Sequence, residues 1–218
     1  MVGRMKLTEI NILATLQQEE FKEIMQRFTK KTFAPETVMF FPDQPENLVY
    51  IVVRGKVRIY LTYEDGREFT LSILEPGDIY STHTRSFARA LEEVEILAIE
   101  TGEFAKIIRY KPDLTAVMVK VLGDCLRNSI DIIEGLVFKE VTHRLVEFFI
   151  SLAVERGEKT EEGILVDLGL TTEQIALMVG STRQTVSRIL NDLADKGILE
   201  RKKRKKWLIK NLDLLKRI

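Results

Sequence analysis

The chain has 218 residues, 45% of them hydrophobic, and its 33 basic residues balance its 33 acidic ones. This size and composition predict two domains with a substantial core, and no apolar run approaches the length of a membrane span. The N-terminal segment lacks the pattern of a secretory signal, so we expect a cytoplasmic protein. A single cysteine, Cys125, excludes an internal disulfide and an iron–sulfur cluster held by several thiolates.

The neutral total hides an uneven distribution of charge. Residues 171–218 contain 12 lysines and arginines against 5 aspartates and glutamates, a balance of +7. The rest of the chain contains 21 against 28, a balance of −7. A positive C-terminal part is typical of a protein that binds the phosphate backbone of a nucleic acid.

Turn signals recur through residues 31–100 at the spacing of short antiparallel strands. The segments between them are rich in Val, Ile, Thr, Tyr and Phe, which favour strands. Val57, Ile59 and Leu61 alternate with Arg58, Tyr60 and Thr62, the pattern of a strand with one buried face. These features predict a small antiparallel β-roll with strands at residues 37–41, 48–53, 56–63 and 69–73.

A long helix is expected from Pro112 to about Val137, because proline is favoured at a helix start and none follows it. Apolar residues lie on two faces of this helix. The first face comprises Val119, Leu122, Leu126, Ile133 and Leu136, and the second comprises Leu114, Met118, Val121, Cys125 and Ile132. One face would pack on the β-roll and the other on the same helix of a second subunit in a parallel coiled coil. The alternative is a helix buried inside one larger domain.

Residues 171–190 predict two short helices joined by a turn at Gly180, the pattern of a DNA-reading helix-turn-helix. Thr171 and Gln174 have the form of a capping box, and glycine supplies the positive φ that ends the first helix. The second helix presents polar residues that suit base edges in the major groove, where arginine pairs with guanine and glutamine with adenine. These residues are Thr182, Arg183, Gln184, Ser187 and Arg188. The alternative is an ordinary helical hairpin with a solvated polar face.

A basic run at 201–206 follows, between the short apolar runs Ile198–Leu199 and Trp207–Ile209. The apolar runs would pair as a β-hairpin with the basic residues on its turn, which is the outline of a winged helix. Beside a helix-turn-helix, such a run favours phosphate contacts over a merely solvated loop. The residues expected to make these contacts are Lys202, Lys203, Arg204 and Lys205.

The order of β-roll, long helix and winged helix-turn-helix resembles the CRP/FNR superfamily of bacterial transcription regulators over essentially the whole chain. The resemblance implies an α+β fold, with a cyclic-nucleotide-binding-like β-roll at 1–111, a dimerisation helix at 112–137 and a DNA-binding domain at 138–218. It also implies a homodimer on palindromic double-stranded DNA, with RNA polymerase as a further partner. By the same resemblance, the base contacts come from Arg183, Gln184 and Arg188.

The cyclic-nucleotide readers of this superfamily carry a Gly-Glu-x-x-Leu segment and, later, an Arg-Ser or Arg-Thr pair that holds the phosphate. Here Gly77 is followed by Asp78, and Arg85-Ser86 comes after a shorter segment. The residues between them look instead like the CooA branch, the haem-containing carbon monoxide sensors. That resemblance implies haem b (iron protoporphyrin IX) as cofactor and carbon monoxide as effector.

Several residues match individual positions of that branch. His83 stands at its haem-ligating histidine, and Asn47 at an asparagine that hydrogen-bonds the ligating imidazole. The N-terminal segment resembles one whose terminal amine, here that of Val2, is the second iron ligand. Ser81 departs from the branch, because some members have there a cysteine that ligates oxidised iron. The far side of the haem is matched by Val119, Leu122, Gly123 and Leu126.

Two alternatives of different kinds stay open. The first is a regulator of the same superfamily that responds to another effector, such as a cyclic nucleotide. The second is a cupin-like metalloenzyme, which is disfavoured because His83 and His143 are distant and supply too few ligands. No nucleophile, base and orienting group fall in one motif, so we expect a regulator and no enzyme.

Overall fold

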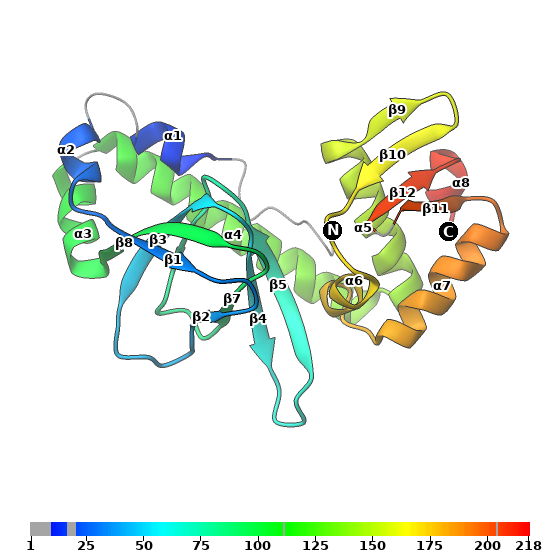
Figure 1. Ribbon diagram of the computed structural model, residues 1–218, viewed down its shortest axis with the longest axis horizontal. Helices are drawn as coiled ribbons and strands as arrows, with labels where there is room; N and C mark the ends of the chain where they lie inside the picture. The colour runs from blue at the N-terminus through cyan, green and yellow to red at the C-terminus, as the bar shows by residue number, and fades with distance from the viewer. Residues whose placement is uncertain (1–9, 17–20, 111, 204) are drawn as a thin grey trace. The chain divides into compact units, whose positions relative to one another are not determined.

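The computed structural model describes residues 10–16, 21–110, 112–203 and 205–218 (Figure 1). The chain divides into two compact units, one reaching Arg127 and the other beginning at Asn128. The boundary falls inside the long helix α4 (Pro112–Phe138). Within the described ranges, no helix is both long and apolar enough to cross a membrane.

The first unit contains the β-roll, drawn in blue to green in Figure 1. Its strands form the sheets β1-β8-β3-β6 and β2-β7-β4-β5, in which neighbours pair antiparallel. The strands are β1 (Thr29–Phe33), β2 (Val38–Phe40), β3 (Leu48–Arg54), β4 (Val57–Thr62), β5 (Glu68–Leu74), β6 (Ile79–Ser81), β7 (Phe87–Ala90) and β8 (Val94–Glu100). The predicted roll is confirmed, and its four expected strands are β2 to β5.

The core of the roll draws apolar side chains from both sheets, among them Tyr50, Val52 and Ile96. A second apolar cluster joins β3 and β8 to α1 (Ile12–Leu16), α2 (Lys22–Met25), α3 (Thr101–Tyr110) and the first half of α4. These two clusters pack the strands β3 and β6, which carry the loops with Asn47 and His83.

Strand β4 departs from the predicted alternation, because Arg58 and Tyr60 are buried as well as Val57 and Ile59. The Arg58 guanidinium donates to Thr70 Oγ1 at 2.8 Å, pairs with Glu68 and lies over the Tyr60 ring. Bonds of this kind offset much of the cost of burying an arginine, although Arg58 Nη2 has no hydrogen-bond partner among the described residues. Both faces of β4 are therefore covered.

Helix α4 has the predicted length and the two predicted apolar faces. Leu114 and Val121 are buried in the second cluster, and Met118 and Cys125 pack against it from half-buried positions. The other face is open to solvent: Val119, Leu122, Leu126 and Ile133 are between 61% and 66% exposed. One face thus packs on the β-roll, as expected, and the other is uncovered.

The second unit is a winged helix-turn-helix built on α5 (Val141–Arg156). Its remaining elements are β9 (Glu158–Thr160), β10 (Gly163–Asp167), α6 (Thr172–Met178), α7 (Arg183–Asp195), β11 (Leu199–Lys203), β12 (Lys206–Ile209) and α8 (Leu212–Leu215). The sheet order is β11-β12-β10-β9. The basic run was expected on the turn of the β11-β12 hairpin, but most of it lies in the strands, because β11 extends to Lys203 and β12 begins at Lys206.

Candidate functional site

Local hydrogen bonds cap the starts of α6 and α7. Thr171 Oγ1 accepts from the Gln174 N–H at 3.2 Å, and Gln174 Oε1 accepts from the Thr171 N–H at 2.8 Å. This is the predicted capping box, and it satisfies donors that the first helical turn leaves free. Gly180 adopts a φ of +63° after α6, and Thr182 caps α7 by accepting from the Thr185 N–H at 3.2 Å.

Helix α7, orange in Figure 1, is anchored through Val186, Ile189, Leu190 and Leu193, which are buried. Its opposite face lines a shallow groove made of Arg183, Gln184, Ser187, Arg188, Asn191 and Asp192. The structure therefore brings together the predicted base-reading side chains, at the exposed start of one helix. The sequence did not point to Asn191 and Asp192. They lie four residues after Ser187 and Arg188, a helical spacing that could have placed them on the same face.

Some basic side chains of the wing are paired with carboxylates, so fewer of them are available to contact phosphate than the sequence predicts. The Lys202 ammonium lies 2.7 Å from a Glu162 carboxylate oxygen and 2.8 Å from one of Glu200. Both hydrogen bonds raise the pKa of Lys202, and the bond to Glu162 has the larger effect. Lys206 pairs similarly with Asp167 at 3.2 Å. Lys203 and Lys205 are exposed, whereas Arg204 lies outside the described residues.

In the β-roll, hydrogen bonds join the loop before β3 to the loop after β6. Thr82 Oγ1 accepts from the Leu48 N–H at 2.8 Å and donates to the Glu46 carbonyl at 2.8 Å. The Thr82 N–H donates to the Leu48 carbonyl at 2.9 Å. Asn47 and His83, far apart in the sequence, are therefore carried by neighbouring segments.

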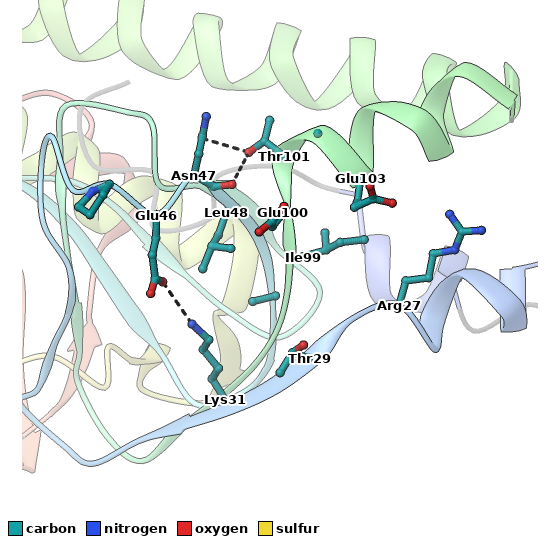
Figure 2. A pocket seen from close by; sticks show the side chains of 13 residues that line it. Arg27, Thr29, Lys31, Glu46, Asn47, Leu48, Ile99, Glu100, Thr101 and Glu103 are labelled. Atoms are coloured by element: carbon teal, nitrogen blue, oxygen red, sulfur yellow. Dashed lines mark hydrogen bonds and ion pairs between the residues drawn. The ribbon is translucent and has the colours of Figure 1, made fainter.

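Asn47 and His83 nevertheless have separate hydrogen-bond partners. Asn47 Oδ1 accepts from Thr101 Oγ1 at 3.1 Å, and the Asn47 carbonyl accepts from the same hydroxyl at 3.0 Å (Figure 2). The exposed His83 ring makes a short hydrogen bond through Nδ1 to Ser81 Oγ. Thr101 holds the asparagine at the start of α3, and the bond from Asn47 to a ligating imidazole stays a prediction.

A pocket of about 680 Å³ lies beside Asn47, and its lining includes Arg27, Lys31, Glu46, Glu100 and Glu103. Figure 2 shows Lys31 paired with Glu46, at 3.4 Å, on one side of it. His83 is not among the residues that line it. Its charged walls do not suit the apolar face of a macrocycle, so we do not assign it to haem.

The uncovered face of α4 suits a haem better. Val119, Leu122 and Leu126 expose apolar side chains, and a Cβ placed on Gly123 would meet no atom within 4 Å. A flat macrocycle could therefore approach the helix backbone at the glycine. With the exposed imidazole of His83, the donor set and the apolar surface fit haem ligation by histidine. Val2 lies outside the described residues, and its role stays a prediction.

Other metal chemistry has little support in the part of the chain that the structure describes. No group there of three or more His, Cys, Asp or Glu residues could hold a metal ion. Burial, followed by the charges of Asp124 and Asp78, raises the pKa of Cys125 to about 11. The thiol is therefore protonated at neutral pH and is a poor iron ligand, because the thiolate is the form that binds metals.

Comparison with known proteins agrees with this architecture. A cyclic nucleotide-binding domain model matches residues 30–111, and a Crp-like helix-turn-helix domain model matches residues 143–218. A global nitrogen regulator from Synechocystis sp. is 30% identical over 91% of this chain and 92% of its own. A CRP-like cAMP-activated global transcriptional regulator from Mycobacterium tuberculosis is 29% identical over 73% and 74%, respectively.

Among solved structures, a mutant of CooA from Carboxydothermus hydrogenoformans is 45% identical, covers 99% of this chain and 98% of that chain, and has a TM-score of 0.94. The imidazole-bound CO-dependent transcription factor CooA from the same organism is 46% identical over 98% of both chains, with a TM-score of 0.56. The chain therefore belongs to the CRP/FNR family, whose members are transcription regulators and not enzymes.

Proposed function

We propose that this CRP/FNR-family regulator senses carbon monoxide through a bound haem b and binds palindromic DNA as a homodimer. The observation that carries the proposal is the 45% identity to CooA over nearly the whole chain. It is supported by an exposed imidazole at His83 and by the uncovered apolar face around Gly123. Activation of transcription through RNA polymerase is part of the same proposal.

His83 would hold the iron from the β-roll, while Val119, Leu122 and Leu126 would cover the macrocycle from α4. Ferrous haem would supply the iron to which carbon monoxide binds. The predicted second protein ligand is the amine of Val2. Ser81 has a hydroxyl and no sulfur, and the thiol of Cys125 is held protonated. Neither residue therefore offers a thiolate ligand to oxidised iron.

The signal would reach DNA through α4, which runs without interruption from the haem-lining positions to Phe138. A change at Leu122 or Leu126 that shifts two such helices against each other would re-aim the segment 134–138 and the DNA-binding unit that follows it. The gas acts only to the extent that it binds the DNA-competent arrangement more tightly than the inactive one.

Spectroscopy of the full-length protein made with added haem tests this function. We expect one haem per subunit, a ferrous spectrum that changes on addition of carbon monoxide, and tighter DNA binding with the gas. His83→Ala should alter the ferrous spectrum because the nitrogen that would hold the iron is lost. His143→Ala is the matched control, since that histidine is also exposed. Absence of haem, or identical spectra for the two variants, would overturn the proposal.

A cyclic-nucleotide effector is the second candidate, favoured by the domain model over residues 30–111 and by the cAMP-activated relative. The side chains at the expected nucleotide positions argue against it. Asp78 is fully buried and its Oδ2 accepts from the Glu75 N–H at 2.8 Å, so it holds a turn. Ser86 is buried and contacts Thr84 Oγ1 at 2.8 Å. A response of haem-free protein to cAMP in DNA binding would favour this candidate.

A further inference from the structure

The exposed face of α7 that lines the shallow groove contains one acidic side chain, Asp192. It lines the same groove as Arg183 and Arg188 and is exposed, as they are. It lies four residues after Arg188 and four before Lys196, the spacing at which side chains of a helix meet. Within the described part of the chain, its carboxylate nevertheless forms no ion pair with either residue. Its acceptor atoms therefore remain available on the surface that would face DNA.

A carboxylate at this position opposes DNA binding unless a base compensates for it. The unit around it is positive, since residues 171–218 contain 12 lysines and arginines against 5 aspartates and glutamates. Phosphates attract these basic residues and repel Asp192, and this repulsion is the same for every sequence because phosphates carry no sequence information. Only a hydrogen-bond donor on a base edge can offset the repulsion at particular sequences.

The bases differ in what they offer to a carboxylate in the major groove. An ionised carboxylate only accepts hydrogen bonds. Guanine presents the acceptors N7 and O6 and thymine the acceptor O4, so both disfavour it. Adenine presents a donor at N6 but an acceptor at N7 beside it. Cytosine presents only the N4 amino donor, and it is therefore the base that suits an aspartate.

We propose that Asp192 is a specificity-determining residue, which accepts a hydrogen bond from the N4 amino group of a cytosine near the base that Arg188 reads. Side chains four residues apart on a helix have Cβ atoms about 5–6 Å apart, and successive base pairs are about 3.4 Å apart. The two side chains would therefore contact bases within about two base pairs of each other. The inference rests on the DNA binding in the proposed function, but not on haem or carbon monoxide.

Selection from a pool of randomised duplexes tests the assignment with the full-length protein. The protein is made with added haem, and the bound duplexes are sequenced with and without carbon monoxide. Arg188→Ala locates the base that Arg188 reads, because the preference there is lost. Near that base, wild type should prefer cytosine roughly fivefold over the other bases, the lower end of the range for a good contact to a base.

Asp192→Asn should switch this preference from cytosine to adenine, because an amide accepts from N6 and donates to N7 of adenine. Asp192→Ala should leave no preference at that position. Asp195→Asn is the matched control, since it removes the same charge from an exposed residue of α7 that does not line the groove. Both asparagine variants should bind duplexes of unrelated sequence more tightly than wild type, but Asp195→Asn should keep the cytosine preference.

An unchanged cytosine preference in Asp192→Asn, or its loss in Asp195→Asn, would contradict the proposal. So would loss of the base preference of Arg188 in Asp192→Asn, because Asp192 would then act by orienting the arginine. If the selected sequences and the affinity are the same with and without carbon monoxide, the proposed gas sensing fails while the reading by Asp192 stands. If wild type selects no sequence under either condition, base reading by α7 is wrong, and the role of Asp192 with it.

Discussion

Arg183 is exposed at the first turn of α7, immediately after the Thr182 cap. Its position suits a bidentate contact to guanine. We expect Arg183→Ala to weaken the binding free energy for the cognate duplex by roughly 1–3 kcal/mol and to relax the preference for that base. Titration of duplexes with single-base changes measures this, with Arg217→Ala as a control at another exposed arginine of the same unit. Full sequence preference in Arg183→Ala would mean that another residue reads that base.

Cys125 should be slow to react in the folded protein. Its pKa is raised to about 11, first by burial and then by Asp124 and Asp78, so the reactive thiolate is scarce at neutral pH. The rate of alkylation by iodoacetamide should rise with pH up to about 11 in native protein. In urea-unfolded protein it should reach half its maximum near about pH 8.5. A native rate that levels off near pH 8.5 would contradict the structural account of the thiol.

At the scale of the element, the wing carries acidic residues that restrain its basic ones. Glu162→Gln removes one of the two carboxylates that hold Lys202. We expect this change to tighten binding to all duplexes alike and to steepen the salt dependence by up to about one unit of slope. The neighbouring exposed Glu161→Gln changes the net charge equally without releasing Lys202. Equal effects of the two variants in salt titrations would show that only net charge matters.

The open face of α4 leads to a test of the dimer. Ile133 is 61% exposed, and a charge placed there would be buried between two paired helices. Ile133→Glu should therefore sediment as a monomer at concentrations where wild type is a dimer, and should bind a palindromic site more weakly. Arg127→Glu introduces the same side chain at a position 70% exposed and outside both apolar faces. A dimer unaffected by Ile133→Glu would place the subunit contact elsewhere.

Local features of the fold could be predicted from the sequence because they depend on neighbouring residues. The capping box at Thr171 and the turn at Gly180 involve residues a few positions apart, and both are found. The pairing of β1 with β8 could not be predicted, since it joins segments more than 60 residues apart. The ion pair of Lys202 with Glu162 and the bond of Thr101 to Asn47 could not be predicted either, because their partners also lie far apart in the sequence.

At the scale of the whole molecule, Arg144 connects the end of α4 to the helix-turn-helix. Its guanidinium donates to the Lys139 carbonyl at 2.5 Å, to that of Val179 at 2.7 Å and to that of Gly180 at 3.3 Å. Only a planar fork of donors can reach all three acceptors. The residue is 6% exposed, and desolvation lowers its pKa.

Arg144→Lys should therefore leave at least one carbonyl without its donor. We expect a loss of about 1–3 kcal/mol in the free energy of unfolding, and a smaller difference in DNA affinity with and without the effector. Thermal unfolding and DNA titration with and without carbon monoxide measure the two effects. Arg156→Lys makes the same substitution at the end of the same helix. If both variants respond to the gas as wild type does, Arg144 serves stability alone.

The bare helix face around Gly123 has a consequence for a cell that is short of iron. Val119, Leu122 and Leu126 are both the proposed cover of the haem and part of the face on which two copies would meet. Whatever factor haem adds to the pairing of subunits, pairing adds to the retention of haem. If haem strengthens pairing, scarce haem leaves fewer loaded subunits and also fewer pairs. Occupancy of palindromic promoters would fall more steeply than the haem supply itself.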